Sequence, residues 1–458
     1  MSLTLKEKIT YGLGSLGISL ITVIHMLYLV YVFFPADNAG LVYVIPQTSI
    51  FMGLTVLGLV LFASRLFDVI TDPLVAHLSD MSKHPKGKRL PFMKRAALPM
   101  GLSYVLVFFV PFADQIHHLN VVWLTLFMFL SALFLTLYSI PYYSLIVDMG
   151  KSPEDKIDLG TYSSLFWFLG FLIVSFATTS WDYLESAFSI TRLQSLQLSF
   201  VIIGLFGVIS LMVPVIFLDE KKYESDMNRE HISLKKSLKT AMGNRNFIRF
   251  FRSLIAYGVA TYIFESGLIY YITVLALLDE GAQGGLTTII GVLTLGMYPL
   301  INKVSKKQGK KPVMVVGFIL FGISFVLIGL LGLGSMSVYL ILGMIVLLSP
   351  FSQACFTILP GVVTADCASY ESYKTGEDHS AMYMAMISFG QKLGSSIGMI
   401  LFTSFLLLGK DVGNDLGIRL AVFFSAGLCV IGLLSVLSYD EKEIMSYAGE
   451  LKQASGDA

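Results

Sequence analysis

The sequence predicts an all-α membrane protein with twelve transmembrane helices, arranged as two six-helix bundles in a 6+6 pseudo-repeat. Three observations support this. Of the 458 residues, 55% are hydrophobic and only 14% are charged, which excludes a soluble domain with a large core. Apolar runs recur along the whole chain, and a basic turn recurs at equivalent places in its two halves.

The apolar runs predict the helices in order. The first continues to about Phe34 without a small-residue cleavage site, so we expect a retained span and not a signal peptide. The eighth is interrupted by two glycines and a proline. The predicted helices cover residues 11–34, 50–76, 96–112, 121–147, 161–178, 196–218, 250–278, 286–301, 313–333, 338–365, 382–408 and 418–437.

A long polar stretch separates the two halves of the chain. We expect an N-terminal six-helix bundle at 1–218, a cytosolic linker at 219–247, a C-terminal bundle at 248–437 and a cytosolic tail at 438–458. Residues 231–242 are compatible with an amphipathic helix, although a solvated connector is the simpler interpretation.

The placement of Lys and Arg predicts that both termini are cytosolic. In that orientation Arg192, Lys410 and Arg419 lie on the opposite side, and Arg65 and Lys392 lie within spans. All other basic residues fall on the cytosolic side. We therefore expect a multi-pass protein of the plasma (inner) membrane.

A Gly-basic-basic turn occurs between the second and third spans, at Gly87–Arg89, and again between the eighth and ninth, at Gly309–Lys311. Basic turns are expected from the orientation alone, so the information lies in the repeated position. The repeat supports a transporter with a central site near the bilayer midplane. The candidate gating residues are Asp80, Gly87, Lys88 and Arg89, with a merely solvated loop acid as the alternative for Asp80.

The second predicted span contains three ionisable side chains, Arg65, Asp68 and Asp72. A charge near the bilayer centre costs roughly 2.5–3.5 kcal/mol on insertion scales, so such residues are rare and usually functional. Their spacing places them on one helix face. Two carboxylates one turn apart repel unless a cation accompanies them, which predicts a cation site. A structural interhelical ion pair is the alternative.

Two further charges lie within predicted spans, Glu265 and Lys392. Lys392 is too deep to reach either surface and needs a carboxylate partner, for which Asp68 and Asp72 are the candidates. Small residues beside it, Gly394 and Gly398, would let another helix approach closely. The formal charges of Arg65, Lys392, Asp68 and Asp72 sum to zero. An ionised Glu265 then leaves one negative charge for a monovalent cation to neutralise.

The sequence contains no Walker loop, no His/Cys metal spacing and no Ser–His–Asp arrangement. We therefore expect no enzyme and no cofactor, with energy supplied by an ion or solute gradient. Cys355, Cys367 and Cys429 do not suggest a disulfide framework. The expected partners are a small-molecule substrate and the lipid bilayer, without nucleic acid, and we expect a monomer.

Several segments together resemble the glycoside–pentoside–hexuronide:cation symporters, the melibiose-permease-like branch of the major facilitator superfamily. They span nearly the whole chain, and the aspartate motif and the Asp366 segment are the most specific. The resemblance implies the major facilitator fold. The matching segments are Lys6–Gly14, Arg65–Pro73, Gly87–Phe92, Ile140–Leu145, Asp366–Glu377 and Gln391–Gly394.

The resemblance also implies roles for individual residues. In that family the acids matching Asp68 and Asp72 bind the coupling Na⁺, Li⁺ or H⁺, and the position matching Thr136 completes the site. The lysine matching Lys392 links cation occupancy to substrate binding. We expect Arg65 and Glu265 to tune this network.

The sugar site departs from the family pattern. Ser19 and Ser139 occupy the positions at which galactoside carriers have aspartates, Ser164 replaces an arginine and Tyr143 replaces a tryptophan. A serine cannot replace a carboxylate that accepts two hydroxyl hydrogen bonds, so galactosides are poor candidates. These four residues and Trp167 are the candidate substrate contacts.

Three functions remain open from the sequence. The first is cation-coupled symport of another glycoside, sugar or sugar acid. The second is symport of an amphipathic solute such as a lysophospholipid, with which the 34 phenylalanines are compatible. The third is an uncoupled uniporter or a ligand-binding sensor, against which the acid pair and Lys392 argue. The sequence does not choose between Na⁺ and H⁺.

Overall fold

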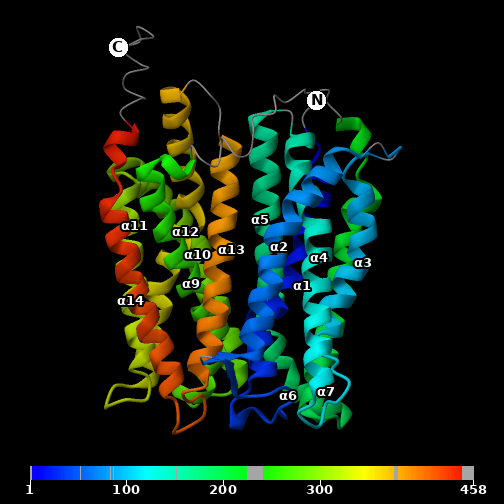
Figure 1. Ribbon diagram of the computed structural model, residues 1–458, viewed down its shortest axis with the longest axis vertical. Helices are drawn as coiled ribbons and strands as arrows, with labels where there is room; N and C mark the ends of the chain where they lie inside the picture. Colours follow the sequence, from blue (N-terminus) through cyan, green and yellow to red (C-terminus); the bar gives the residue numbers. More distant parts are fainter. Residues whose placement is uncertain are drawn as a thin grey trace. The chain divides into compact units, whose positions relative to one another are not determined.

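The structure, a computed structural model, is almost wholly helical (Figure 1). Most of the predicted linker, including residues 231–240, lies outside the described residues, as does the tail after residue 445. The structure describes residues 3–51, 53–82, 84–85, 87–150, 152–223, 241–375 and 380–445.

Each of the twelve predicted apolar runs contains a helix. In the first half of the chain the helices are α1 (Leu5–Phe33), α2 (Val56–Asp80), α3 (Leu90–Leu106), α4 (His118–Met149), α5 (Pro153–Ser175), α6 (Ala177–Phe188) and α7 (Arg192–Phe217). In the second half they are α9 (Arg245–Tyr270, continued by a π-turn at Tyr271–Leu275), α10 (Glu280–Gln308), α11 (Lys310–Gly329), α12 (Val338–Thr375), α13 (Ser380–Leu406) and α14 (Leu416–Ser438).

The second predicted span, 50–76, begins before the helix does, because α2 starts only at Val56. Residues 49–55 instead form two short antiparallel strands, β1 (Ser49–Phe51) and β2 (Leu54–Thr55). Gly53 turns the chain with φ +82°, a conformation that favours glycine. The Thr55 hydroxyl then accepts the Gly58 N–H at 2.9 Å and fixes the start of α2.

The fifth predicted span is interrupted. α5 ends at Ser175, and α6 begins at Ala177 after the non-helical Phe176. α6 packs against α7, and its Trp181 is fully buried, with the indole N–H donating to the Ser199 hydroxyl at 3.0 Å. An apolar pattern alone does not reveal this break, because the apolar residues continue through it.

The chain forms two compact units that do not follow its two halves. The first unit contains residues 1–228 together with Leu268–Thr288 and Leu406–Asp415, and the second contains the remainder. In the first unit α1 packs against α5 and α7, α3 packs against α4 and α7, and α2 packs against α4. In the second unit α11 packs against α12 and α14. The predicted bundle boundaries stay a prediction.

Close approach between α1 and α7 depends on glycine. A Cβ atom at Gly17 would lie 2.7 Å from the Gly207 carbonyl oxygen, which no side chain tolerates. Through these contacts α1 is buried over most of its length. Its first turn is fixed by a capping box between Thr4 and Glu7.

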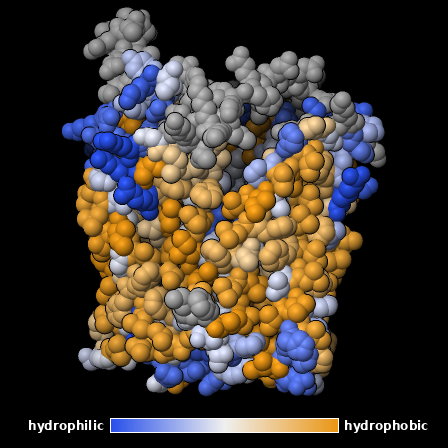
Figure 2. All heavy atoms as spheres, in the orientation of Figure 1, coloured by the Kyte–Doolittle hydropathy of each residue, from blue (hydrophilic) through white to orange (hydrophobic). Residues whose placement is uncertain are grey.

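The surface is that of a membrane protein. On the face shown in Figure 2, hydrophobic residues cover the middle of the helices and hydrophilic residues gather at their ends. Within the described ranges, nine helices are long and apolar enough to cross a bilayer. α2 is not among them, because Arg65, Asp68 and Asp72 lie in its middle. The three cysteines are buried free thiols.

Candidate functional site

The predicted cation site lies on α2, which packs against α4. Asp68 is almost completely buried, at 1% exposed. The Arg65 Nη1 atom lies 3.3 Å from Asp68 Oδ2, one helical turn away. The arginine side chain is one-third exposed, so it offsets part of the cost of burying this carboxylate.

The second carboxylate of the pair meets α4. The Thr136 hydroxyl donates to Asp72 Oδ1 at 3.0 Å, and Thr136 is buried. Other hydroxyls of α4, those of Thr125, Ser131 and Ser144, donate to carbonyl groups one turn earlier in their own helix. The Thr136 hydroxyl instead points to another helix, so the three predicted cation-site residues share one small region.

The chemistry of these donors suits a hard monovalent cation or a proton. Carboxylate and hydroxyl oxygens are the ligands that such cations prefer. Arg65, Asp68 and Asp72 together carry one formal negative charge, which one cation would neutralise. The described part of the chain holds no cluster of three His, Cys, Asp or Glu side chains suited to a metal. A cation at Asp68 and Asp72 would need the Thr136 hydroxyl oxygen as a further ligand.

Lys392 and Glu265 lie in the second compact unit, on α13 and α9, and both are half-buried. The predicted close helix approach beside Lys392 is confirmed: a Cβ atom at Gly258 of α9 would lie 3.3 Å from the Gly394 Cα. The pairing of Lys392 with the α2 acids stays a prediction, as does the tuning role of Glu265.

The predicted substrate contacts occupy different environments. Ser19 is fully buried where α1 meets α5, and a Cβ atom at Gly170 would lie 2.8 Å from the Ser19 Cβ. Ser139 is half-buried and Tyr143 is 45% exposed, both on α4. Ser19 is therefore placed in helix packing, whereas the two α4 residues have accessible surface.

The two predicted contacts on α5 are accessible. Ser164 is exposed, with its hydroxyl donating to the Gly160 carbonyl at 2.9 Å. Trp167 is half-buried and stacks on Phe171 with ring centroids 5.9 Å apart. These side chains can offer a hydroxyl and an aromatic face to a solute, and their role stays a prediction.

A carboxylate that was not predicted from the sequence, that of Glu220, binds the first Gly-basic-basic turn. Glu220 accepts the backbone N–H groups of Lys88 and Arg89 at 2.7 and 2.8 Å, and that of Leu90 at 3.0 Å. Gly87 has φ +107°. The carboxylate therefore satisfies the free N–H groups at the start of α3.

The Arg89 side chain extends this network. Its Nε lies 3.2 Å from Asp148 Oδ2, at the end of α4, and its Nη1 donates to the Ser79 hydroxyl at 2.7 Å. The turn thus joins α2, α3 and α4. The side chain of Asp80, the remaining gating candidate, lies outside the described residues.

The second turn repeats the same chemistry. Glu441 accepts the backbone N–H groups of Lys310 and Lys311 at 2.7 and 2.9 Å, and Gly309 has φ +91°. The Lys310 side chain pairs with Asp366 of α12. A sequence signal was present, because the triplet Asp-Glu-Lys begins at residue 219 and again at residue 440.

Comparison with known proteins gives the family. Residues 10–413 match the family model of the MFS/sugar transport proteins. The chain is 24% identical to the glucuronide carrier protein homolog of Escherichia coli (strain K12), covering 76% of this chain and 74% of that protein. It is 23% identical to a putative sulfoquinovose importer of Salmonella typhimurium, covering 95% and 89%.

The fold is also found among solved structures. The nucleoside transporter NupG aligns with a TM-score of 0.64 at 14% identity, covering 95% of this chain and 99% of that chain. The predicted all-α membrane fold of the major facilitator type is confirmed, and so is the expectation of a transporter and not an enzyme. The chain belongs to the MFS/sugar transport protein family.

Proposed function

We propose that this protein is a symporter that couples a monovalent cation, Na⁺ or H⁺, to the movement of a sugar solute carrying an acidic group. It works by alternating access in the plasma membrane, with both termini in the cytosol. Asp68, Asp72 and Thr136 bind the cation.

The observation that carries the cation site is the hydrogen bond from Thr136 to Asp72 at 3.0 Å. It joins α4 to the acid pair of α2, where Asp68 is buried beside Arg65. A buried carboxylate is costly unless it is compensated. Arg65 compensates Asp68 in part, and a cation held by Asp68, Asp72 and Thr136 would add to that compensation.

The relatives support an acidic sugar. One is named for a glucuronide and the other for sulfoquinovose. A glucuronide carries a carboxylate and sulfoquinovose a sulfonate, so both solutes are anionic sugars. With Lys392 counted beside Arg65, Asp68 and Asp72 the formal charges sum to zero, so an anionic solute and a cation that bind together leave the site neutral. Neutrality lowers the cost of moving the loaded site through the bilayer. Lys392 links the two ligands in this proposal.

The test is uptake by proteoliposomes of a radiolabelled aryl glucuronide and of the matching neutral glucoside. A sodium or proton gradient is expected to drive glucuronide uptake. Asp72→Asn should abolish the response to the gradient. Asp158→Asn, which alters a half-exposed carboxylate paired with Lys8, should leave it unchanged.

Each outcome bears on a separate part of the proposal. Equal uptake with and without either gradient would refute cation coupling. Gradient-driven uptake of the neutral glucoside in preference to the glucuronide would refute the acidic solute.

A further inference from the structure

Two segments from the second half of the chain belong to the first compact unit, Leu268–Thr288 and Leu406–Asp415. Each carries one charged side chain that is buried by residues from the first half of the chain. They are Glu280, the first residue of α10, and Lys410, which follows α13. Their residual exposures are 11% for the Glu280 side chain and 7% for Lys410.

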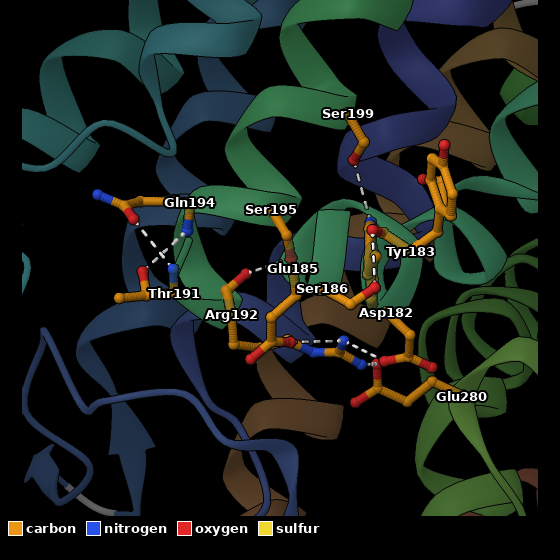
Figure 3. A network of polar contacts seen from close by, with 12 residues as sticks. Asp182, Tyr183, Glu185, Ser186, Thr191, Arg192, Gln194, Ser195, Ser199 and Glu280 are labelled. Carbon is orange, nitrogen blue, oxygen red and sulfur yellow. Dashed lines mark hydrogen bonds and ion pairs between the residues drawn. The ribbon is translucent and has the colours of Figure 1, made fainter. Parts of the chain in front are cut away.

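Glu280 is bound by two side chains, of which Arg192 is labelled in Figure 3. Its Oε2 atom pairs with Arg192 Nη2 at the start of α7, and its Oε1 atom accepts the hydroxyl of Tyr31 of α1. Both partners are themselves largely buried. A carboxylate in this environment is held by a charge-assisted pair and a phenol hydrogen bond, which together exceed a surface ion pair in strength.

Arg192 has further carboxylate partners, both from α6. Its Nη1 atom lies 2.5 Å from Asp182 Oδ1 and 3.3 Å from Glu185 Oε2, and the guanidinium carbon lies 5.5 Å from the centroid of the Trp181 ring. Asp182 and Glu185 pair with Arg192 independently of Glu280, so they would still compensate the buried arginine if Glu280 left. The Arg192–Glu280 contact is therefore suited to repeated breaking and reforming.

Lys410 is bound at the end of α1. Its ammonium donates to the Pro35 carbonyl and to the Tyr43 hydroxyl, and lies 3.3 Å from Asp411 Oδ1. The same Asp411 oxygen accepts the Asp37 N–H at 2.8 Å. Burial, together with the neighbouring Asp37 carboxylate, raises the pKa of Tyr43 above its usual value, so this phenol stays neutral at physiological pH.

Other residues of the Leu268–Thr288 segment also pack closely against the first half of the chain. A Cβ atom at Gly284 would lie 2.6 Å from the Ser175 carbonyl oxygen. The Asn38 amide donates to the Thr273 carbonyl at 3.2 Å, and the Tyr270 hydroxyl to the Phe34 carbonyl at 2.6 Å. Any separation of the two segments from the first-half helices must break all of these contacts.

We infer that Glu280 and Lys410 form a two-point latch at the end of the transporter where α1 and α13 end and α7 and α10 begin. The latch holds this end shut and must release before the end can open. Glu280 is negative and is held by the Arg192 guanidinium and the Tyr31 hydroxyl. Lys410 is positive and is held by carbonyl, hydroxyl and carboxylate oxygens. Both side chains are largely shielded from water while these contacts are formed. Opening exchanges these contacts for water, so the two side chains set the population and the rate of the open state.

The latch can be tested by thiol labelling at a position that it covers. Thr178 is 1% exposed, and its hydroxyl lies 3.3 Å from the Cβ position of Gly284. In a background in which Cys355, Cys367 and Cys429 are replaced by Ala, Thr178→Cys is labelled with a maleimide in the purified full-length protein. We expect labelling about tenfold faster in Glu280→Gln and in Lys410→Gln, equivalent to about 1.4 kcal/mol.

The matched control is Asp182→Asn. It removes a charge that also contacts Arg192 but that belongs to the first half of the chain, so its labelling rate should stay within about twofold of the parent. If Glu280→Gln fails to fold, Tyr31→Phe replaces it, because it removes one hydrogen bond to Glu280 and keeps the ion pair. We expect about a threefold faster rate for Tyr31→Phe, in line with one lost hydrogen bond.

Parent-like labelling of the Glu280 and Lys410 variants would overturn the latch, as would an equal acceleration by Asp182→Asn. The experiment requires neither a cation nor a solute. Its failure is therefore distinguishable from failure of the proposed symport.

Discussion

At the scale of single residues, the site depends on where one hydroxyl points. Thr136 donates to Asp72 of α2, whereas the neighbouring Thr125 and Ser131 hydroxyls return to the backbone of α4. A hydroxyl that donates to the half-buried Asp72 carboxylate keeps its oxygen lone pairs available to a cation beside that carboxylate. In the proposed cation site, Thr136 thus adds a neutral ligand to two carboxylates that already supply the negative charge.

Replacing Thr136 with Val removes this ligand and keeps the side-chain shape. We expect the apparent affinity for the coupling cation to fall about tenfold, since one hydrogen bond to a charged group contributes about 1.5–3 kcal/mol. Thr136→Ser keeps the hydroxyl and should stay within about threefold of the parent. The measurement is the sodium or proton dependence of solute uptake. Parent-like cation affinity in Thr136→Val would show that Thr136 is structural only.

The polar residues of the proposed cation site and latch differ in how well the sequence predicts them. Asp68 and Asp72 stand out because charges inside an apolar run are rare, and Thr136 is predicted only through the family resemblance. Arg192 and Lys410 appear in the sequence as basic residues on the side that has few, without any sign of their partners. Those partners are far away in the chain, so only the fold brings them together.

At the scale of elements, the repeated Gly-basic-basic turns act as capped helix starts. Gly87 has φ +107°, and a Cβ atom there would lie 2.5 Å from the carboxylate carbon of Glu220. Glu220 in turn accepts N–H groups of the first turn of α3. The turn needs glycine for its backbone and for the space that the carboxylate occupies.

Gly87→Ala should lower the apparent melting temperature more than Gly53→Ala. Both positions have positive φ, which costs an alanine about 1–2 kcal/mol. Apart from its chain neighbours, no described residue has an atom within 4 Å of the Cβ position of Gly53, whereas Gly87→Ala would also displace Glu220. Fluorescence-detected thermal unfolding of the two variants checks this. Equal losses would mean that Glu220 moves aside without cost.

Glu220→Gln tests the charge of the cap at nearly constant size. The carboxylate faces the positive end of α3, where a negative charge contributes about 0.3–1 kcal/mol when exposed and up to about 2 kcal/mol when partly buried. We expect a lower melting temperature, and a loss of similar size for Glu441→Gln at the second turn. If Glu220→Gln matches the parent, the backbone hydrogen bonds alone hold the turn.

The helices themselves follow from the apolar runs, because a span must bury about 20 apolar residues in lipid. The strand pair at 49–55 and the break at Phe176 do not. Both features depend on single local hydrogen bonds, from the Gly58 N–H to the Thr55 hydroxyl and from the Trp181 indole to the Ser199 hydroxyl. Hydropathy averages over windows longer than either feature.

At the scale of the whole molecule, the proposed symport requires the cation and the solute to bind to the carrier together. A ligand present at 100 times its Kd should stabilise the protein by about 2.7 kcal/mol. We therefore expect an aryl glucuronide to raise the melting temperature in the presence of the coupling cation, and much less in choline chloride at pH 8. Equal stabilisation in both media would contradict linked binding.

Cation movement driven by the solute is the decisive test of the proposed symport. Proteoliposomes without any cation gradient are given an inward gradient of the glucuronide, and entry of ²²Na⁺ or acidification of an internal dye is recorded. We expect downhill solute flux to carry the cation inward in the parent protein and not in Asp72→Asn. Solute entry without cation movement in the parent would contradict the proposed symport.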